Sequence, residues 1–240
     1  MKRRPKSPGS EEKSAVPAAE DASAILQVKV WLLDISPMVW RRLLVPSSYT
    51  LRELHGVIQV AMGWEGIHLY DFELRAARYG SWELSAFSPD VTLASLRLRK
   101  GARFIYEYDL NIPWRHEVRI EDRLRLKTGK TYPVCSGGSG ACPPEDCGGP
   151  QSFMAGRDER FSFDALEDLD TMAEVMQRVM AADGSNTLSE VIDEDTRWRL
   201  EAAVERARAR EVAQGRPFSR RAVNASLRDN EHHNLMHQQY

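Results

Sequence analysis

Residues 104–121 read Phe-Ile-Tyr-Glu-Tyr-Asp-Leu-Asn-Ile-Pro-Trp-Arg-His-Glu-Val-Arg-Ile-Glu, and this stretch decides the fold. Large apolar and charged side chains alternate along 104–108 and again along 114–121, as in strands that bury one face. Asn111-Ile112-Pro113 lies between the two runs and favours a turn. The pattern predicts a β-hairpin within an antiparallel sheet.

The segments before this hairpin add further strands and a helix. Alternation along 25–32, 39–45 and 68–74 predicts three strands. Thr50 and Glu53 have the spacing of a capping box, and apolar residues then recur at helical spacing, which predicts a helix from 51 to near Gly63. The predicted fold class is therefore α+β, with a mostly antiparallel sheet packed against helices.

Composition divides the 240 residues into four parts. Residues 1–23 contain almost no large apolar side chain and are expected to be a disordered lead. Residues 24–180 are expected to form the α+β domain, whose last helix would begin at Thr171. Residues 181–214 would form a helical extension beginning at Thr187, and residues 215–240 a disordered tail.

Charge and hydropathy limit the classes of function. The formal net charge is -2, so the overall field attracts neither nucleic acid nor acidic ligands. The chain has no run approaching the roughly 18 apolar residues of a membrane span, and its first residues lack the apolar core of a signal peptide. A cytoplasmic protein with no membrane partner is expected.

The three cysteines lie in one Cys/Gly/Pro-rich segment, residues 132–150, where a long irregular loop is expected. Reduced thiols are expected because an odd number of cysteines in one loop is a poor disulfide framework. Cys135, Cys142 and Cys147 could converge on zinc, with His116 as the fourth ligand and His55 or His68 as the next candidates. The alternative is a set of buried, unliganded thiols, because the spacing is not Cys-x2-Cys.

Other residues could line a site beside this loop. His116 shares a strand face with Trp114, so a half-buried core histidine is the alternative to a base that activates a cysteine. Glu145 and Asp146 could act as general acid and base, or could form an ordinary helix cap or ion pair. His55, at the border of a helix's apolar face, could line the site or simply pack.

Nucleic-acid contact would have to come from a local patch. Lys2, Arg3 and Arg4 open the chain and could contact phosphates. Arginines near the C-terminus alternate with glutamates, so ion pairing on a solvated helix is the alternative there. Weak, salt-sensitive and sequence-independent binding is the expectation.

Four sequence blocks, in the same order, resemble the plasmid pRiA4b ORF-3-like family, also labelled the insertion-element passenger TnpR or resolvase-like family. The blocks are residues 39–42, 54–72, 114–117 and 142–149. The resemblance implies an association with plasmids and mobile elements but no defined activity. The chain departs from the family's acidic Gly-Asp-Asp turn at residues 110–113, which puts any metal chemistry of that turn in doubt. We find no nucleophilic Ser or Tyr within an arginine cluster, so the resolvase label is not supported.

Three functional hypotheses follow. The first is a non-enzymatic binding or accessory protein associated with mobile DNA, whose surface lies where the 104–121 hairpin meets the cysteine loop. The second is a metal- or thiol-dependent enzyme that uses the same junction. The third is a protein-interaction module whose long C-terminal helix docks a partner.

Overall fold

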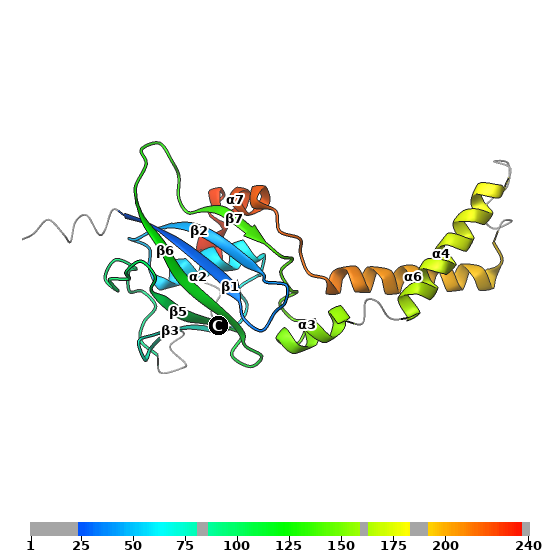
Figure 1. The fold of residues 1–240 in the computed structure, drawn as a ribbon, viewed down its shortest axis with the longest axis horizontal. Coiled ribbons are helices and arrows are strands. Elements are labelled where there is room, and N and C mark those ends of the chain that lie inside the picture. The colour runs from blue at the N-terminus through cyan, green and yellow to red at the C-terminus, as the bar shows by residue number, and fades with distance from the viewer. Residues whose placement is uncertain (1–23, 81–85, 159–162, 183–191, 237–240) are drawn as a thin grey trace, which may run out of the picture.

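A seven-stranded antiparallel sheet forms the centre of the protein (Figure 1). The structure, a computed structural model, describes residues 24–80, 86–158, 163–182 and 192–236. The sheet order is β4-β3-β5-β6-β1-β2-β7. The strands are β1 (Ala24–Leu32), β2 (Trp40–Pro46), β3 (Tyr70–Leu74), β4 (Ala77–Gly80), β5 (Arg103–Tyr108), β6 (Trp114–Arg125) and β7 (Val134–Ser139). The predicted α+β class and the 104–121 hairpin are confirmed.

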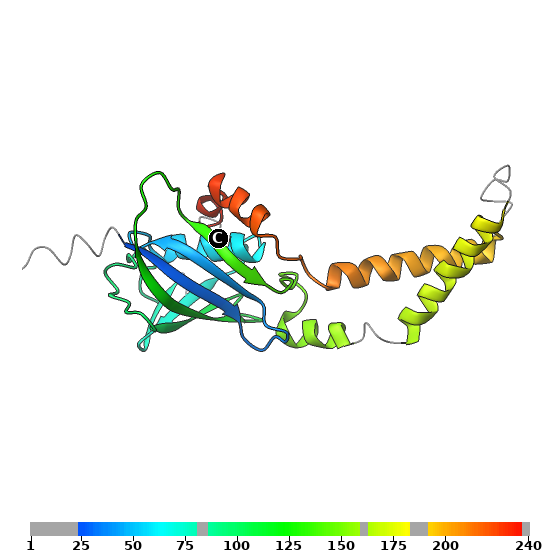
Figure 2. The ribbon, with the colours of Figure 1, turned by 45° about the horizontal axis from the view of Figure 1, so that its top comes forward.

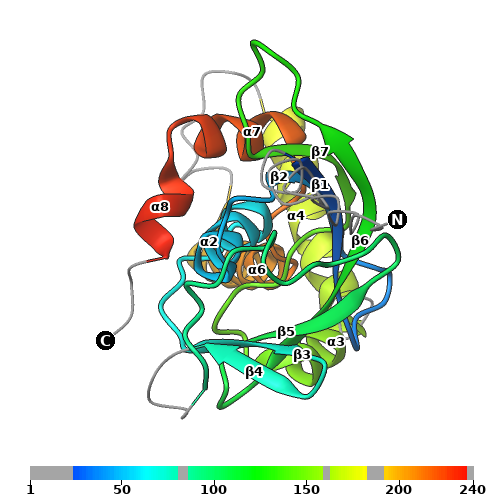
Figure 3. The ribbon, with the colours of Figure 1, turned by 90° about the vertical axis from the view of Figure 1, so that its left-hand side faces the viewer.

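One face of the sheet is covered by helix α2 (Leu51–Met62), as Figure 3 shows. The predicted capping box is present, because the Thr50 side chain and the Glu53 carboxylate each accept a backbone N–H. The helix ends at Gly63 in the left-handed conformation, as is common at helix C-termini. Apolar residues of α2 and of the inner sheet face make one buried core.

Helix α8 (Glu231–Leu235) covers the side of α2 that faces away from the sheet, and α7 (Arg220–Arg228) lies beside the edge strand β7 and one end of α2 (Figure 3). The sequence prediction for 215–240 was a disordered tail, and it is wrong for residues 220–235. The region contains few apolar residues, but Leu227 and His232 are buried, so packing against α2 supplies the burial that composition did not indicate. Residues 237–240 lie outside the described residues.

Two helices form an arm that projects from the sheet (Figures 1 and 2). After α3 (Gly149–Asp158), the chain runs outward along α4 (Phe163–Ala181) and returns along α6 (Glu194–Ala213). Asp168 of α4 is buried and accepts hydrogen bonds from Arg206 and Arg210 of α6. We call α4 and α6 together the arm.

Two predictions, the start of one helix and the irregular cysteine loop, differ from the structure. Helix α4 begins at Phe163 rather than at Thr171, whose hydroxyl instead donates to the Glu167 carbonyl inside the helix. The expected start at Thr187 lies outside the described residues, as does the 1–23 lead. Within the cysteine loop, β7 is regular because it pairs with the edge of β2.

None of the described helices is both long enough and apolar enough to cross a bilayer.

Gly56 lets α8 lie directly on α2. A Cβ atom at this position would stand 2.0 Å from the His232 carbonyl oxygen. Gly56→Ala is therefore expected to lower the free energy of unfolding by about 1–3 kcal/mol, although Ala is normally the better helix former. Gly156→Ala in α3 is the matched control, because a Cβ there meets no atom within 4 Å. We expect this control to be neutral or stabilising in urea unfolding; equal destabilisation of the two variants would contradict the packing of α8.

Candidate functional site

The cysteine loop folds onto the hairpin formed by β5 and β6. Trp114 Nε1 donates to the Glu145 carbonyl oxygen at 3.0 Å, and the Tyr108 hydroxyl donates to the Glu145 carboxylate. The other carboxylate oxygen of Glu145 accepts the Glu65 backbone N–H at 2.7 Å. Glu145 therefore accepts hydrogen bonds that join three segments, and no helix cap or ion pair of this residue is present among the described residues.

Trp64 completes this junction. Its Nε1 donates to the Pro143 carbonyl oxygen at 2.9 Å, and its ring edge faces His116 with 5.4 Å between centroids. The same ring stacks on Tyr108 at 5.3 Å. Asp146 lies apart at the rim, with one carboxylate oxygen 2.9 Å from His68 Nε2. The junction is therefore filled by aromatic rings and closed by hydrogen bonds.

Both histidines predicted to line the site are buried in this aromatic core. His116 Nδ1 lies 2.9 Å from the Trp114 carbonyl oxygen, and its Nε2 has no hydrogen-bond partner among the described residues. His55 stacks on Tyr70 at 3.7 Å and lies 2.7 Å from the Tyr106 hydroxyl. Burial lowers the pKa of each imidazole to about 3. Both rings are therefore neutral near pH 7.

The three thiols are also in their neutral form. Cys135 and Cys142 are 1% exposed, and Cys147 is half-buried. Burial raises the pKa of Cys142 to about 12, although Arg41 acts in the opposite direction. Burial also raises the pKa of the other two thiols. A thiolate nucleophile requires a lowered pKa, so this arrangement gives no support to thiol catalysis.

The four predicted zinc ligands are not brought together as a group. Within the described ranges, which contain all four, no cluster of three or more His, Cys, Asp or Glu side chains is arranged to hold a metal ion. Zinc binding by Cys135, Cys142, Cys147 and His116 stays a prediction from sequence.

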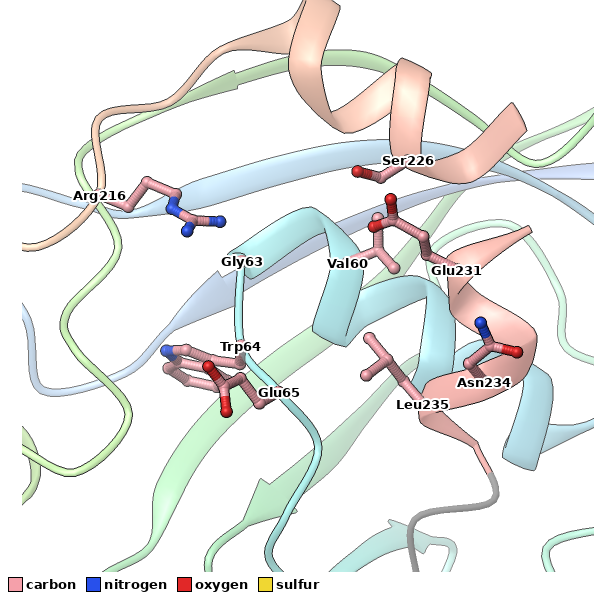
Figure 4. A pocket seen from close by; sticks show the side chains of 9 residues that line it. All are labelled: Val60, Gly63, Trp64, Glu65, Arg216, Ser226, Glu231, Asn234 and Leu235. Atoms are coloured by element: carbon pink, nitrogen blue, oxygen red, sulfur yellow. The ribbon is translucent and has the colours of Figure 1, made fainter. Parts of the chain in front are cut away.

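Two pockets adjoin the junction. One, of about 370 Å³, lies between the end of α2 and the C-terminal helices, and its sides carry Arg216, Glu231 and Asn234 (Figure 4). The other is a groove of about 1050 Å³ between the cysteine loop and the end of α6. Charges of both signs line each pocket, and carboxylates outnumber arginines in both.

The sheet face opposite α2 is not covered by any described helix, and we call it the open face (Figures 1 and 3). Four cationic side chains form one row across it, called the cation row. Arg103 of β5 pairs with Arg119 of β6, Arg119 with Lys29 of β1, and Lys29 with Arg42 of β2. Because adjacent strands lie about 4.8 Å apart, the row spans about 14 Å. Like charges directly opposite one another destabilise a sheet, so this row costs stability.

Carboxylates neutralise only the ends of the cation row. Glu117 and Glu121 pair with the two outer arginines at 3.1 and 2.5 Å. The two inner members, Lys29 and Arg119, form no ion pair with any residue in the described part of the chain. The centre of the open face is thus cationic although the whole chain has a net charge of -2.

A pair of tryptophans lies next to the cation row. Trp31 and Trp40 are direct cross-strand neighbours, and both rings are half-buried. Lys29 Nζ lies 5.4 and 5.2 Å from their centroids, and the Arg42 guanidinium lies 5.3 Å from the Trp40 centroid. The Trp40 ring lies over Gly137 of β7, where a Cβ would be 3.7 Å from the ring, at ordinary contact distance. Cations and aromatic faces therefore share one surface.

Sequence reasoning missed this surface. The signal was present, since Lys29-x-Trp31 and Trp40-x-Arg42 each place a cation and a tryptophan on one strand face. Alignment of the row also depends on a register shift between Gln27 and Val28, where β1 pairs with β6. The predicted contacts Lys2, Arg3 and Arg4 lie outside the described residues.

Comparisons with known proteins place the chain among relatives of unknown activity. Over 138 residues it is 36% identical to the uncharacterized protein y4hQ of Sinorhizobium fredii (strain NBRC 101917 / NGR234), covering 55% of this chain and 71% of that protein. The crystal structure of MM3350 from Methanosarcina mazei Go1, a protein of unknown function, is 28% identical with a TM-score of 0.55. That match covers 68% of this chain and 94% of the solved one. Residues 24–168 match the family described as plasmid pRiA4b ORF-3-like protein, and the chain belongs to that family.

Proposed function

We propose that this protein is a non-enzymatic binding protein whose open face binds single-stranded nucleic acid. The cation row carries the proposal, because it keeps two unpaired charges, on Lys29 and Arg119, in line between two arginines. Phosphates bound along the row would relieve the repulsion between its members. Release of counterions from the nucleic acid would favour the complex further.

The tryptophans favour a single strand over a duplex. The open face is a sheet surface with no described helix standing on it to enter a groove of duplex DNA (Figure 1). Unpaired bases, in contrast, can stack on aromatic rings. Trp31 and Trp40 lie one row from the cations, so a strand can place its phosphates on the cation row and its bases on the rings.

The junction of the cysteine loop and the hairpin supports a non-enzymatic role. Its buried histidines are neutral and its thiols have raised pKa values, so neither His116 nor Cys142 is suited to act as a base or a nucleophile. The family description names a plasmid reading frame, from which we take an association with plasmids and mobile DNA.

The test is fluorescence anisotropy with labelled DNA and RNA strands of about 16 nucleotides, and with a duplex of the same length. Four phosphate contacts predict that the logarithm of the association constant falls with the logarithm of salt concentration with a slope of about -3. The double variant Lys29→Gln, Arg119→Gln should reduce this slope to about -1.4. Trp31→Ala should weaken binding by about 5- to 150-fold.

The matched control for net charge is the double variant Arg221→Gln, Arg228→Gln. Both arginines are exposed on α7, away from the open face, and their loss changes the net charge by the same amount. We expect the control to keep the wild-type slope. Absence of binding to every strand at about 50 mM salt would refute the proposal. So would a control variant whose salt slope falls as much as that of the double variant Lys29→Gln, Arg119→Gln. Tighter binding to the duplex, unaffected by Trp31→Ala, would do the same.

A further inference from the structure

Helix α4 carries two apolar rows along its length, one more than a two-helix hairpin needs. The first row faces α6 and includes the buried residues Ala165 and Val175. The second row is exposed and follows alternating spacings of three and four residues. Its members are Leu166, Leu169, Ala173, Met176 and Met180, and we call them the exposed seam.

This spacing indicates that another helix covers the exposed seam. Residues repeated every three and four positions form the stripe that packs between helices in coiled coils and bundles. In a four-helix bundle each helix contacts two neighbours and therefore shows two adjacent apolar rows. Leu169, Met176 and Met180 are 62%, 65% and 77% exposed, so the described part of the chain provides α4 with only one of its two neighbours.

We infer that the exposed seam packs against the arm of a second copy of this chain, forming an antiparallel four-helix bundle. On the matching flank of α6, helical spacing places Leu200 and Val204 beside the row that faces α4, with Arg197 and Arg208 at the next positions on either side. The opposite flank of the arm is the polar one, because Glu167, Thr171 and Arg199 line the pocket there.

Charge selects how the two arms meet. Helix α4 contains five carboxylates and one arginine, whereas α6 contains five carboxylates and five arginines. Pairing α4 with α4 of the second copy would bring two acidic helices together. Pairing α4 with α6 of the second copy instead places an acidic helix beside arginines, and every neighbouring pair of helices is then antiparallel.

The available area is sufficient for a stable dimer. A 19-residue helix is about 28 Å long, and two adjacent helices present a face about 20 Å wide. Each copy would then cover about 560 Å², and the pair about 1,100 Å² in projection. Specific interfaces bury at least about 1,000 Å² in total, so the arm alone reaches this range.

Sedimentation velocity of the full chain at micromolar concentration tests the inference. We expect a species of twice 27.3 kDa for the wild type. Leu169→Glu with Met176→Glu should place two carboxylates in the interface and raise the dimer dissociation constant at least about 100-fold, leaving a monomer. Circular dichroism of the same samples should show unchanged helix content, which separates dissociation from unfolding.

Trp198→Glu is the matched control. Trp198 is 68% exposed but lies on the polar flank of the arm, so the same kind of substitution should leave the dimer intact. A monomeric wild type, or a dimer that survives Leu169→Glu with Met176→Glu, would overturn the inference. Dissociation by Trp198→Glu alone would overturn it as well, because the interface would then lie on the other flank.

Discussion

The free energy of unfolding is expected to fall by about 5 kcal/mol as pH decreases from 6.5 to 5. Three buried histidines are the cause, because burial holds the pKa of His55 and His116 at about 3 and that of His232 at about 4 in the folded protein. In the unfolded chain the same side chains titrate near 6.5. Each then loses about 1.4 kcal/mol of stabilisation per pH unit below that value.

The sign follows from proton uptake. Between pH 6.5 and pH 5 the unfolded chain binds protons at all three histidines, whereas the folded protein binds almost none there. The contribution of these histidines to the free energy of unfolding is therefore fully present above pH 6.5 and decreases as the pH falls through this window. Since domains typically have about 5–15 kcal/mol in total, the effect should be visible as a large shift in urea midpoint.

Urea unfolding at a series of pH values measures this dependence. His116→Gln should remove about a third of the slope between pH 6.5 and 5 even if it lowers stability at pH 7. His233→Gln is the control, since this histidine lies in α8 outside the aromatic core. A second measurement, NMR of the histidine rings, should show both core imidazoles neutral at pH 5. Protonation of either ring near pH 6 would contradict the prediction.

Arg41→Met is expected to lower the free energy of unfolding by about 3–5 kcal/mol. Arg41 is 1% exposed and has no carboxylate partner among the described residues; its guanidinium donates to four backbone carbonyls instead. These include Ala61 at the end of α2 and Ser139 at the end of β7, at 2.8 and 2.9 Å. The guanidinium also lies 4.4 Å from the Phe218 ring centroid, just before α7.

The expected loss in the free energy of unfolding arises because Arg41→Met leaves backbone carbonyl groups without hydrogen-bond donors. Each buried acceptor that loses its partner costs about 1–3 kcal/mol, and methionine replaces the volume but none of the N–H groups. Arg41→Lys should recover only part of the loss, because one ammonium cannot reach carbonyls on three segments.

Arg42→Met is the matched control in urea unfolding. Its side chain is 36% exposed and pairs with Glu121 on the open face, so we expect a change below about 1 kcal/mol. Similar losses for Arg41→Met and Arg42→Met would show that the carbonyl contacts do not hold the segments together.

The sequence predicted those parts of the fold that local patterns determine. Alternation along residues 104–121 and the Thr50–Glu53 capping box each depend on side chains close in sequence, and both match the structure. Helices α7 and α8 were missed because their stability comes from packing on α2, which no local pattern records. Propensity alone therefore misplaced the end of the folded domain.

The candidate site was less accessible to prediction. The hairpin around Trp114 was expected to meet the cysteine loop that carries Glu145. The neutral state of His116 could not be predicted, because it depends on complete burial of the ring against Trp64 and Tyr106. Predicting the cation row would have required the pairing register of all four strands, β5, β6, β1 and β2, at once. A one-residue change in any pairing would turn one of its members to the other face of the sheet.

The arm is inserted between two points of the chain that lie close together in the sheet domain. The chain leaves the sheet domain through α3 and re-enters at Arg216, whose backbone pairs with Cys142 shortly before α3. A segment that departs and returns at neighbouring points can be lengthened, lost or exchanged without disturbing the strands on either side. The match to the family also ends at residue 168, within α4. The surfaces proposed for dimerisation and for ligand binding thus lie in different stretches of the chain, so each can change in sequence without the other.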